Sequence, residues 1–281
     1  LNDISLLFTI IPTTFLFFSI GLVDDFLNVS AVLRLALQIM ISIWVWDQGI
    51  KIDNLNFLFN KIIDINLPQF LSLFLTIIWI TGITNAINWL DGMNGLLGLF
   101  TLITSLGFFT ISFLTFKPIL LIISSLLIGV SISFLYNNMF KLKIFMGDSG
   151  SLFFGSLLSL MGICLASDFN FSSNSYIITS LNPYIPLLLF SLPIIVTTRV
   201  VLKRISLNIS PFYSDQRHFH HILAQKGLGS YQILLIIFGI TQFSSTSAVQ
   251  FLLERPSFIS LGISLTILIS TILLVRVNLK F

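Results

Sequence analysis

The chain has 281 residues, of which 56% are hydrophobic and only 9% are charged. Soluble globular domains average about 25% charged residues, so this composition excludes a soluble enzyme and indicates a helical membrane protein. The net charge of +3 is small, so we expect no nucleic-acid partner, and the single cysteine, Cys164, excludes an internal disulfide.

Nine stretches of the chain are apolar enough to be membrane-spanning helices, each of which needs about 20 mostly apolar residues. The second is short and has Arg34 near its start, and the eighth contains the polar stretch QFSSTSAVQ. No basic segment or cleavage site precedes the first, so we expect no signal peptide. The sequence predicts an all-α polytopic membrane protein with one integral-membrane domain over residues 1–281. The nine spans cover residues 4–23, 32–47, 68–87, 95–115, 118–137, 151–167, 184–202, 231–251 and 257–275.

The loops fall into two sets on opposite sides of the membrane, and their charges predict which set is cytoplasmic. One set holds the loops near residues 24–31, 88–94, 138–150 and 203–230, together with the C-terminus. Ten of the 14 Lys and Arg residues lie on this side when those inside spans are assigned to the nearer side. Cytoplasmic loops carry the excess of Lys and Arg, so we expect a multi-pass protein of the cell membrane whose four named loops face the cytoplasm.

The string GLVDDF, residues 21–26, closes the first span with two adjacent carboxylates, Asp24 and Asp25. Such a pair can be a solvated charge at a helix end. It can also be a site for a metal ion or for phosphate chemistry, because adjacent carboxylates repel one another unless a cation neutralises them.

The string NAINWLDGMNGLLG, residues 85–98, repeats a polar side chain every three residues at Asn85, Asn88, Asp91 and Asn94. On a helix this spacing keeps the four side chains near one face. They could form a hydrogen-bonded seam between helices. Alternating acid and amide groups are better suited to a hard cation or a nucleotide base.

The string FMGDSGSLFFG, residues 145–155, places Asp148 between two glycines just before a span. Asp148 could cap the helix. Free N–H groups at a helix N-terminus also bind phosphate, and one aspartate there could hold Mg²⁺ against that phosphate.

The string SPFYSDQRHFHHIL, residues 210–223, holds all three histidines of the chain, His218, His220 and His221. Adjacent histidines point in different directions on a helix, which argues against one shared zinc ion. Arg217 beside them indicates anion binding, because arginine pairs well with phosphate. The other reading is a solvated loop.

These four strings lie on one predicted face, and together they resemble the polyprenyl-phosphate sugar-1-phosphate transferases, bacterial glycosyltransferase family 4, in order across about residues 4–235. The resemblance implies transfer of a sugar 1-phosphate from a UDP-sugar to polyprenyl phosphate, with release of UMP and dependence on Mg²⁺, or Mn²⁺ in its place. It implies catalytic roles for Asp24, Asp25 and Asp91, and metal binding by Asp148 and Asn88. It implies substrate binding by Asn85, Asn94, Arg217, His218, His220 and His221.

Within that family the His-x-His-His loop and the NAINWLDG form are closer to the N-acetylhexosamine-1-phosphate transferases of cell-envelope glycan synthesis, such as O-antigen synthesis. Asn28 replaces the lysine typical of the phospho-N-acetylmuramoyl-pentapeptide transferase, which is the alternative within the family. The family also implies two helices upstream of Leu1, or eleven spans in all. The rival classes are a transporter and an inactive binding subunit. The exact sugar and a homodimeric state stay open.

Overall fold

The computed structural model of the chain describes residues 3–56, 64–141, 145–166, 184–208, 210, 219–225 and 227–252. Nearly all of the described residues are helical. The helices are α1 (Asp3–Leu27), α2 (Ala31–Asp47), α3 (Gln69–Asn88), α4 (Leu96–Leu114), α5 (Pro118–Tyr136), α6 (Gly147–Ala166), α7 (Tyr184–Leu189), α8 (Ser191–Ser206), α9 (Phe219–Gln225) and α10 (Ser230–Leu252), with a five-residue π-helix at Asn137–Lys141.

Among the described residues, six helices are long and apolar enough to cross a membrane, which supports a multi-pass membrane protein. They are α1, α3, α4, α5, α6 and α10. The expected nine spans are therefore not confirmed. The second expected span is present as α2, but its 17 residues are short for a crossing, and the stretch 257–275 lies outside the described residues.

The expected span 184–202 is divided into α7 and α8. Pro193 explains the break, because proline has no N–H to donate to the carbonyl of Leu189 four residues earlier and its ring clashes with that carbonyl. Phe190 at the junction is fully buried, so the break lies inside the protein.

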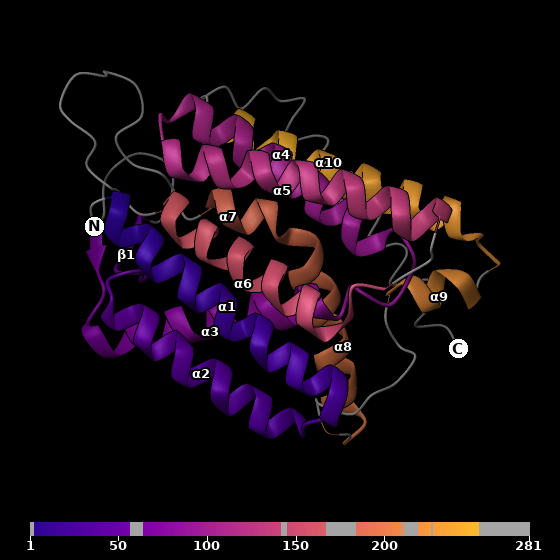
Figure 1. Ribbon diagram of the computed structural model, residues 1–281, viewed down its shortest axis with the longest axis horizontal. Coiled ribbons are helices and arrows are strands. Elements are labelled where there is room, and N and C mark those ends of the chain that lie inside the picture. Colours follow the sequence, from indigo (N-terminus) through magenta and orange to yellow (C-terminus); the bar gives the residue numbers. More distant parts are fainter. Residues whose placement is uncertain are drawn as a thin grey trace.

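The predicted all-α class is confirmed, and the described residues add one short β-hairpin to the helices. Strands β1 (Asn54–Asn56) and β2 (Asp64–Asn66) pair antiparallel in the connection between α2 and α3. Figure 1 shows the hairpin at the end of the molecule where α1 begins, whereas α9 lies at the opposite end.

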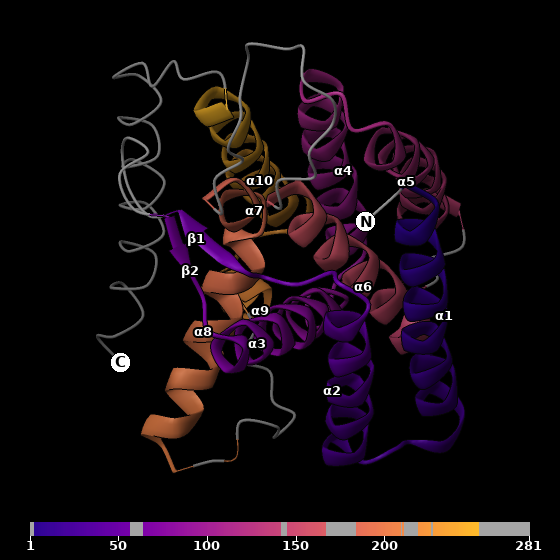
Figure 2. The ribbon, with the colours of Figure 1, turned by 90° about the vertical axis from the view of Figure 1, so that its left-hand side faces the viewer.

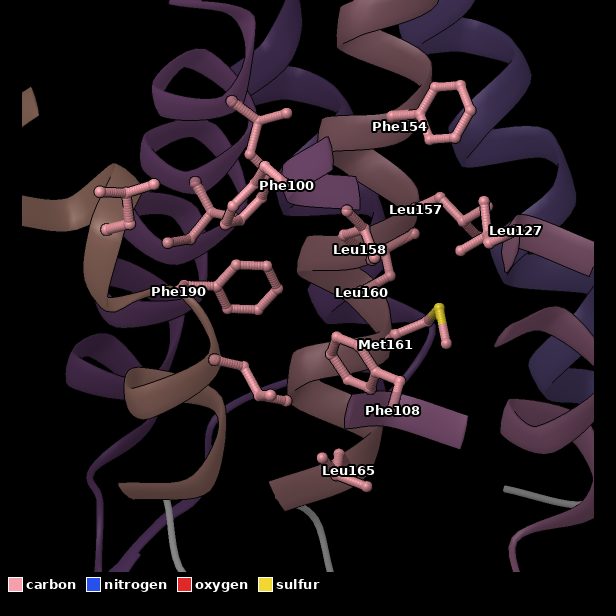
Figure 3. Close-up of a cluster of buried hydrophobic side chains, with 14 of the residues drawn as sticks. Phe100, Phe108, Leu127, Phe154, Leu157, Leu158, Leu160, Met161, Leu165 and Phe190 are labelled. Carbon is pink, nitrogen blue, oxygen red and sulfur yellow. The ribbon is translucent and has the colours of Figure 1, made fainter. Parts of the chain in front are cut away.

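Helix α6 is the most deeply buried of the six long helices and packs against α1 and α3. Figure 2 shows α6 among the other helices, with α1 and α2 side by side. A second group forms where α4 packs against α5 and α10. Aromatic rings join the helices around α6: Phe190, at the junction of α7 and α8, lies 5.9 Å from Phe108 of α4 and 5.8 Å from Trp79 of α3 between ring centroids. Figure 3 shows Phe108 and Phe190 beside Met161 and Leu158 of α6.

Glycines bring the backbone of α6 very close to its two neighbours. A Cβ atom added at Gly21 of α1 would lie 2.3 Å from the carbonyl oxygen of Asp148. A Cβ atom added at Gly155 of α6 would lie 2.8 Å from the carbonyl oxygen of Thr84 in α3. Small residues allow such close helix approach inside membranes. The ends of α1, α3 and α6 are consequently brought together at one point.

Candidate functional site

The C-terminal ends of α1 and α3 meet the N-terminal end of α6 in one polar cluster. Helix α1 contributes Asp24 and Asp25 in its last turn, and α3 contributes Asn88 as its last residue. Helix α6 contributes Asp148 in its first turn. The structure therefore brings together four of the residues that the sequence singled out.

Arg34, in the first turn of α2, joins two of these acids. Its Nη1 nitrogen donates to Oδ2 of Asp24 in a close contact and to Oδ2 of Asp148 at 3.1 Å. From the sequence, Arg34 was noted only as a charged residue near the start of the short second span, and no functional role was predicted for it. The position of Arg34 in an apolar span could have predicted an ion pair, because an arginine at membrane depth needs an acidic partner.

Asp25 caps helix α6 from the neighbouring helix. Its two carboxylate oxygens accept from the backbone N–H groups of Asp148, at 2.8 Å, and Ser149, at 3.0 Å. Gly147, which begins α6, has φ of +72°, a conformation that glycine adopts without strain. Asp148 is thus not the cap of the helix, and the N–H groups considered above for phosphate are occupied by Asp25.

Asn88 fixes the orientation of Asp148. Its Nδ2 group donates to Oδ1 of Asp148 at 2.5 Å and to the hydroxyl of Ser151 at 2.8 Å. The predicted pair of metal ligands is therefore in direct contact. Ser151 was not identified from the sequence, although it lies three residues after Asp148 on the same face of the helix.

Asp91 reaches the same helix end from the loop that follows α3. Its Oδ2 atom accepts from the N–H of Gly147 at 3.1 Å. Burial raises the pKa of Asp91 to about 6, and the nearby carboxylates of Asp148 and Asp25 contribute to the rise, whereas hydrogen bonds from the backbone of Gly147 and Met146 oppose it. Asp91 therefore titrates closer to neutral pH than an ordinary aspartate.

Asn85 lies one turn further into α3, and its side chain is engaged between helices. Its Nδ2 group donates to Oε1 of Gln38 at 2.6 Å and to the carbonyl of Thr81 at 2.7 Å. Asn85 therefore belongs to a hydrogen-bonded seam between helices, the alternative considered above for this string. Gln38, fully buried in α2, was not identified from the sequence. Asn94, the last polar residue of the string, has a buried Oδ1 atom with no hydrogen-bond partner among the described residues.

The histidine string is only partly described. Arg217 and His218 lie outside the described residues, and His220 and His221 belong to α9, with only their backbone described. The end of α8, which leads into the segment that carries this string, does contact the loop after α3: the guanidinium carbon of Arg204 lies 5.1 Å from the centre of the Trp89 ring. The loop after α3 and the end of α8 therefore meet, which agrees with the prediction that both lie on the same side of the membrane.

The donor set at the cluster suits a hard divalent cation. Asp24 and Asp148 already share one positive charge, that of Arg34, and the amide of Asn88 lies beside them. Oxygen ligands of this kind are those that Mg²⁺ prefers, with one or two carboxylates and the remaining positions taken by water and phosphate. Within the described part of the chain, no three acidic, histidine or cysteine side chains form a ready-made metal cage.

Fold and site together define a helical multi-pass membrane protein with acidic and amide side chains gathered where three helix ends meet. The chain belongs to glycosyl transferase family 4, whose sequence pattern matches residues 7–166. This match confirms the family resemblance, and three of the four strings, at residues 21–26, 85–98 and 145–155, lie within it.

Several relatives share this part of the chain. The chain is 31% identical over 244 residues to a Bacillus subtilis protein named "Probable undecaprenyl-phosphate N-acetylglucosaminyl 1-phosphate transferase", an overlap of 84% of this chain and 63% of the relative. It is 29% identical over 254 residues to the decaprenyl-phosphate N-acetylglucosaminephosphotransferase of Mycolicibacterium smegmatis, covering 84% of this chain and 62% of the relative. A shorter match, 30% identical over 106 residues, covers 38% of this chain and 28% of the undecaprenyl-phosphate alpha-N-acetylglucosaminyl 1-phosphate transferase of Haemophilus influenzae. The chain thus spans less than two thirds of the length of these relatives.

Proposed function

We propose that the chain transfers N-acetylhexosamine 1-phosphate from a UDP-sugar to undecaprenyl phosphate or a similar polyprenyl phosphate. The observation that carries this proposal is the polar cluster formed by Asp24, Asp25, Asn88 and Asp148. Family membership and the names of the relatives support the reaction type, and all three relatives above are named for an N-acetylglucosamine phosphate group. The names of these relatives favour neither the pentapeptide substrate nor a transporter.

In this reaction an oxygen of the polyprenyl phosphate attacks the phosphorus that carries the sugar. A new phosphorus–oxygen bond forms, the bond that joins this phosphorus to the oxygen bridging the two phosphates breaks, and that oxygen leaves with UMP. Transfer of a phosphoryl group depends chiefly on positioning and on neutralising charge. Both substrates are anions, so the protein must bring together groups that repel one another.

The residues of the cluster have distinct roles in this proposal. Asp148 and Asn88, with Asp24 nearby, would hold Mg²⁺ or Mn²⁺, which supplies positive charge to the phosphates when it is bound. A carboxylate of the Asp24 and Asp25 pair would orient or deprotonate the attacking phosphate. Asp91, predicted to be catalytic, would act by supporting the start of α6, because it accepts from the N–H of Gly147. Asn94, Arg217, His218, His220 and His221 would bind the UDP-sugar. Asn85 would act indirectly, through its bond to Gln38.

The proposal also includes the orientation of the cluster, the number of membrane spans and the product. The cluster faces the cytoplasm, where UDP-sugars are available, and the chain has more spans than the six found among its described residues, up to the nine expected from its sequence. The product is a lipid-linked sugar diphosphate for cell-envelope glycans.

The test of this function is release of UMP. The purified protein in detergent is given undecaprenyl phosphate and a panel of UDP-N-acetylhexosamines, with Mg²⁺ or with EDTA. We expect UMP release that stops with EDTA, and movement of labelled sugar into the lipid from one preferred donor. UMP without lipid-linked sugar would indicate hydrolysis and would contradict the proposed transfer. Absence of release in a protein extended to the full length of its relatives would also contradict it.

A further inference from the structure

Arg34 occupies the point at which the carboxylates of Asp24 and Asp148 converge. Both acids are contacted by the same nitrogen, Nη1, rather than by the two arms of the guanidinium group. A guanidinium that binds one carboxylate for its own stability typically uses two parallel N–H groups. Two oxygens gathered around a single positively charged nitrogen are arranged as ligands are around a cation.

The other two acids of the cluster are committed to the backbone of α6. Asp25 accepts from the N–H groups of Asp148 and Ser149, and Asp91 accepts from that of Gly147. Among the described acids at this end, Asp24 and Asp148 are therefore the pair that faces a shared cation. Arg34 stands between them.

The two carboxylates are also held by bonds that do not involve Arg34. Asp24 is buried, and its Oδ1 atom accepts from the N–H of Val29 at 2.7 Å. Asp148 accepts from Asn88 at 2.5 Å. Loss of the guanidinium would leave both carboxylates in place, so Arg34 fills this site rather than building it.

Arg34 can leave the site without disturbing its helix. Its side chain is 28% exposed, and a long flexible side chain can move its charged end toward water. One turn further along α2, the buried Gln38 exchanges hydrogen bonds with Asn85 of α3. This pair holds the backbone of α2 against α3 whether or not Arg34 stays between the acids.

We propose that Arg34 is an exchangeable counter-ion of the cation site. In the cation-free protein its guanidinium neutralises Asp24 and Asp148, and a divalent cation binds these carboxylates by displacing it. The exchange keeps the two acids together before the cation arrives, when they would otherwise repel one another. The inference rests on the proposed function, which brings a divalent cation to this cluster. Its consequence is that Arg34 lowers the affinity of the site for that cation.

The first test measures Mn²⁺ binding by electron paramagnetic resonance, in detergent and without nucleotide or lipid. We expect Arg34→Gln to bind Mn²⁺ about tenfold more tightly than the unaltered protein or better, since it removes both a competitor and a like charge within contact distance. Lys51→Gln is the matched control. It removes the same charge from an ion pair with Asp53 at 3.4 Å at the hairpin end, and its affinity should equal that of the unaltered protein. Equal or weaker binding by Arg34→Gln would overturn the inference.

A second measurement uses the unaltered protein and does not depend on how well the variant folds. Arginine labelled with ¹⁵N gives separate signals for the two terminal nitrogens when a guanidinium is held by carboxylates, and Arg34→Lys identifies the Arg34 signals by their loss. Saturating Mg²⁺ should merge the Arg34 signals as the group is freed. Signals that stay unchanged while calorimetry shows Mg²⁺ bound would contradict displacement.

These outcomes separate the inference from the proposed function. If Arg34→Gln binds Mn²⁺ no more tightly while Mg²⁺-dependent UMP release stands, only the exchange is wrong. If neither protein binds Mn²⁺ or Mg²⁺, the exchange and the metal site are both wrong, and UMP release in EDTA then decides whether transfer itself occurs.

Discussion

Asp148 makes more connections between helices than any other residue described for the site. Its carboxylate accepts from Asn88 of α3 and Arg34 of α2, and its backbone N–H donates to Asp25 of α1. The side chain and the main chain of one residue thus fix the relative positions of three helices. The carboxylate and the backbone N–H can be separated experimentally, because a substitution of the side chain leaves the N–H in place.

We expect Asp148→Ala to lower UMP release about a hundredfold or more, a loss typical of removing one group that stabilises charge in the transition state. Asp47→Asn is the control, because Asp47 is an exposed acid at the far end of α2. The measurement is the initial rate of UMP release at saturating Mg²⁺. Near-normal turnover in Asp148→Ala would show that the chemistry lies elsewhere.

Asp91 gives the site a pH dependence that can be measured without substrate. Its pKa is raised from 3.8 to about 6 in the folded protein. As the pH falls through 6, the folded protein takes up a proton that the unfolded chain does not bind until about pH 3.8. Folding is therefore opposed by ionised Asp91 above pH 6, and this cost is relieved progressively between pH 6 and about 4.

We expect the unaltered protein, free of divalent cations, to gain thermal stability relative to Asp91→Asn as the pH is lowered from 7 to 4. Infrared spectroscopy should show a protonated carboxyl band that grows with a midpoint near pH 6 and is missing in Asp91→Asn. A midpoint near 4 would contradict the burial of Asp91.

At the scale of elements, contact between α1 and α6 brings the acids of the two helices together. Gly21 lies one turn before Asp25, and a Cβ atom added to it would meet the backbone of Asp148 and Ser149. Any side chain at Gly21 must push the two helices apart at the point where Asp25 caps α6. The geometry of the site thus depends on a residue that has no functional group.

We expect Gly21→Ala to lower the free energy of unfolding by about 1–3 kcal/mol, the usual cost of overpacking, and to lower UMP release in parallel. Gly129→Ala is the matched control, since Gly129 also lies within a long helix and nothing would contact its Cβ within 4 Å. Thermal unfolding in detergent and UMP release would be measured for both. Normal activity in Gly21→Ala would show that close helix approach is unnecessary for the site.

At the scale of the whole molecule, the polar cluster and the hairpin lie at opposite ends of the bundle. Lys203 is exposed in the last turn of α8, near Arg204 and Trp89, whereas Lys51 precedes the hairpin. If the cluster faces the cytoplasm, these two lysines lie on opposite sides of the membrane. Their accessibility in intact cells therefore reports the orientation.

We expect an impermeant maleimide to label Lys51→Cys in intact cells and to label Lys203→Cys only after the membrane is opened. The native Cys164 is 1% exposed and contributes little background. The reverse pattern would place the cluster outside the cytoplasm and would contradict access to a UDP-sugar there.

The amino-acid pattern predicted most of the helices and the residues of the candidate site. Runs of apolar residues predicted α1 to α6 and α10 to within a few residues, because a membrane span requires a long apolar stretch. Polar strings at the ends of those runs marked Asp24, Asp25, Asn88 and Asp148, because polar groups near membrane depth are costly and conspicuous in so apolar a chain.

The tertiary structure alone decided which of these groups pair. Asp25 bonds to the start of α6, 123 and 124 residues along the chain, and Arg34 bonds to Asp148 across 114 residues. Such pairs depend on how the helices approach one another, which neither periodicity nor composition records. The same packing moved Asn85 into a helix seam with Gln38 and placed a charged arginine between two acids, and both results follow from the need of buried polar groups for partners.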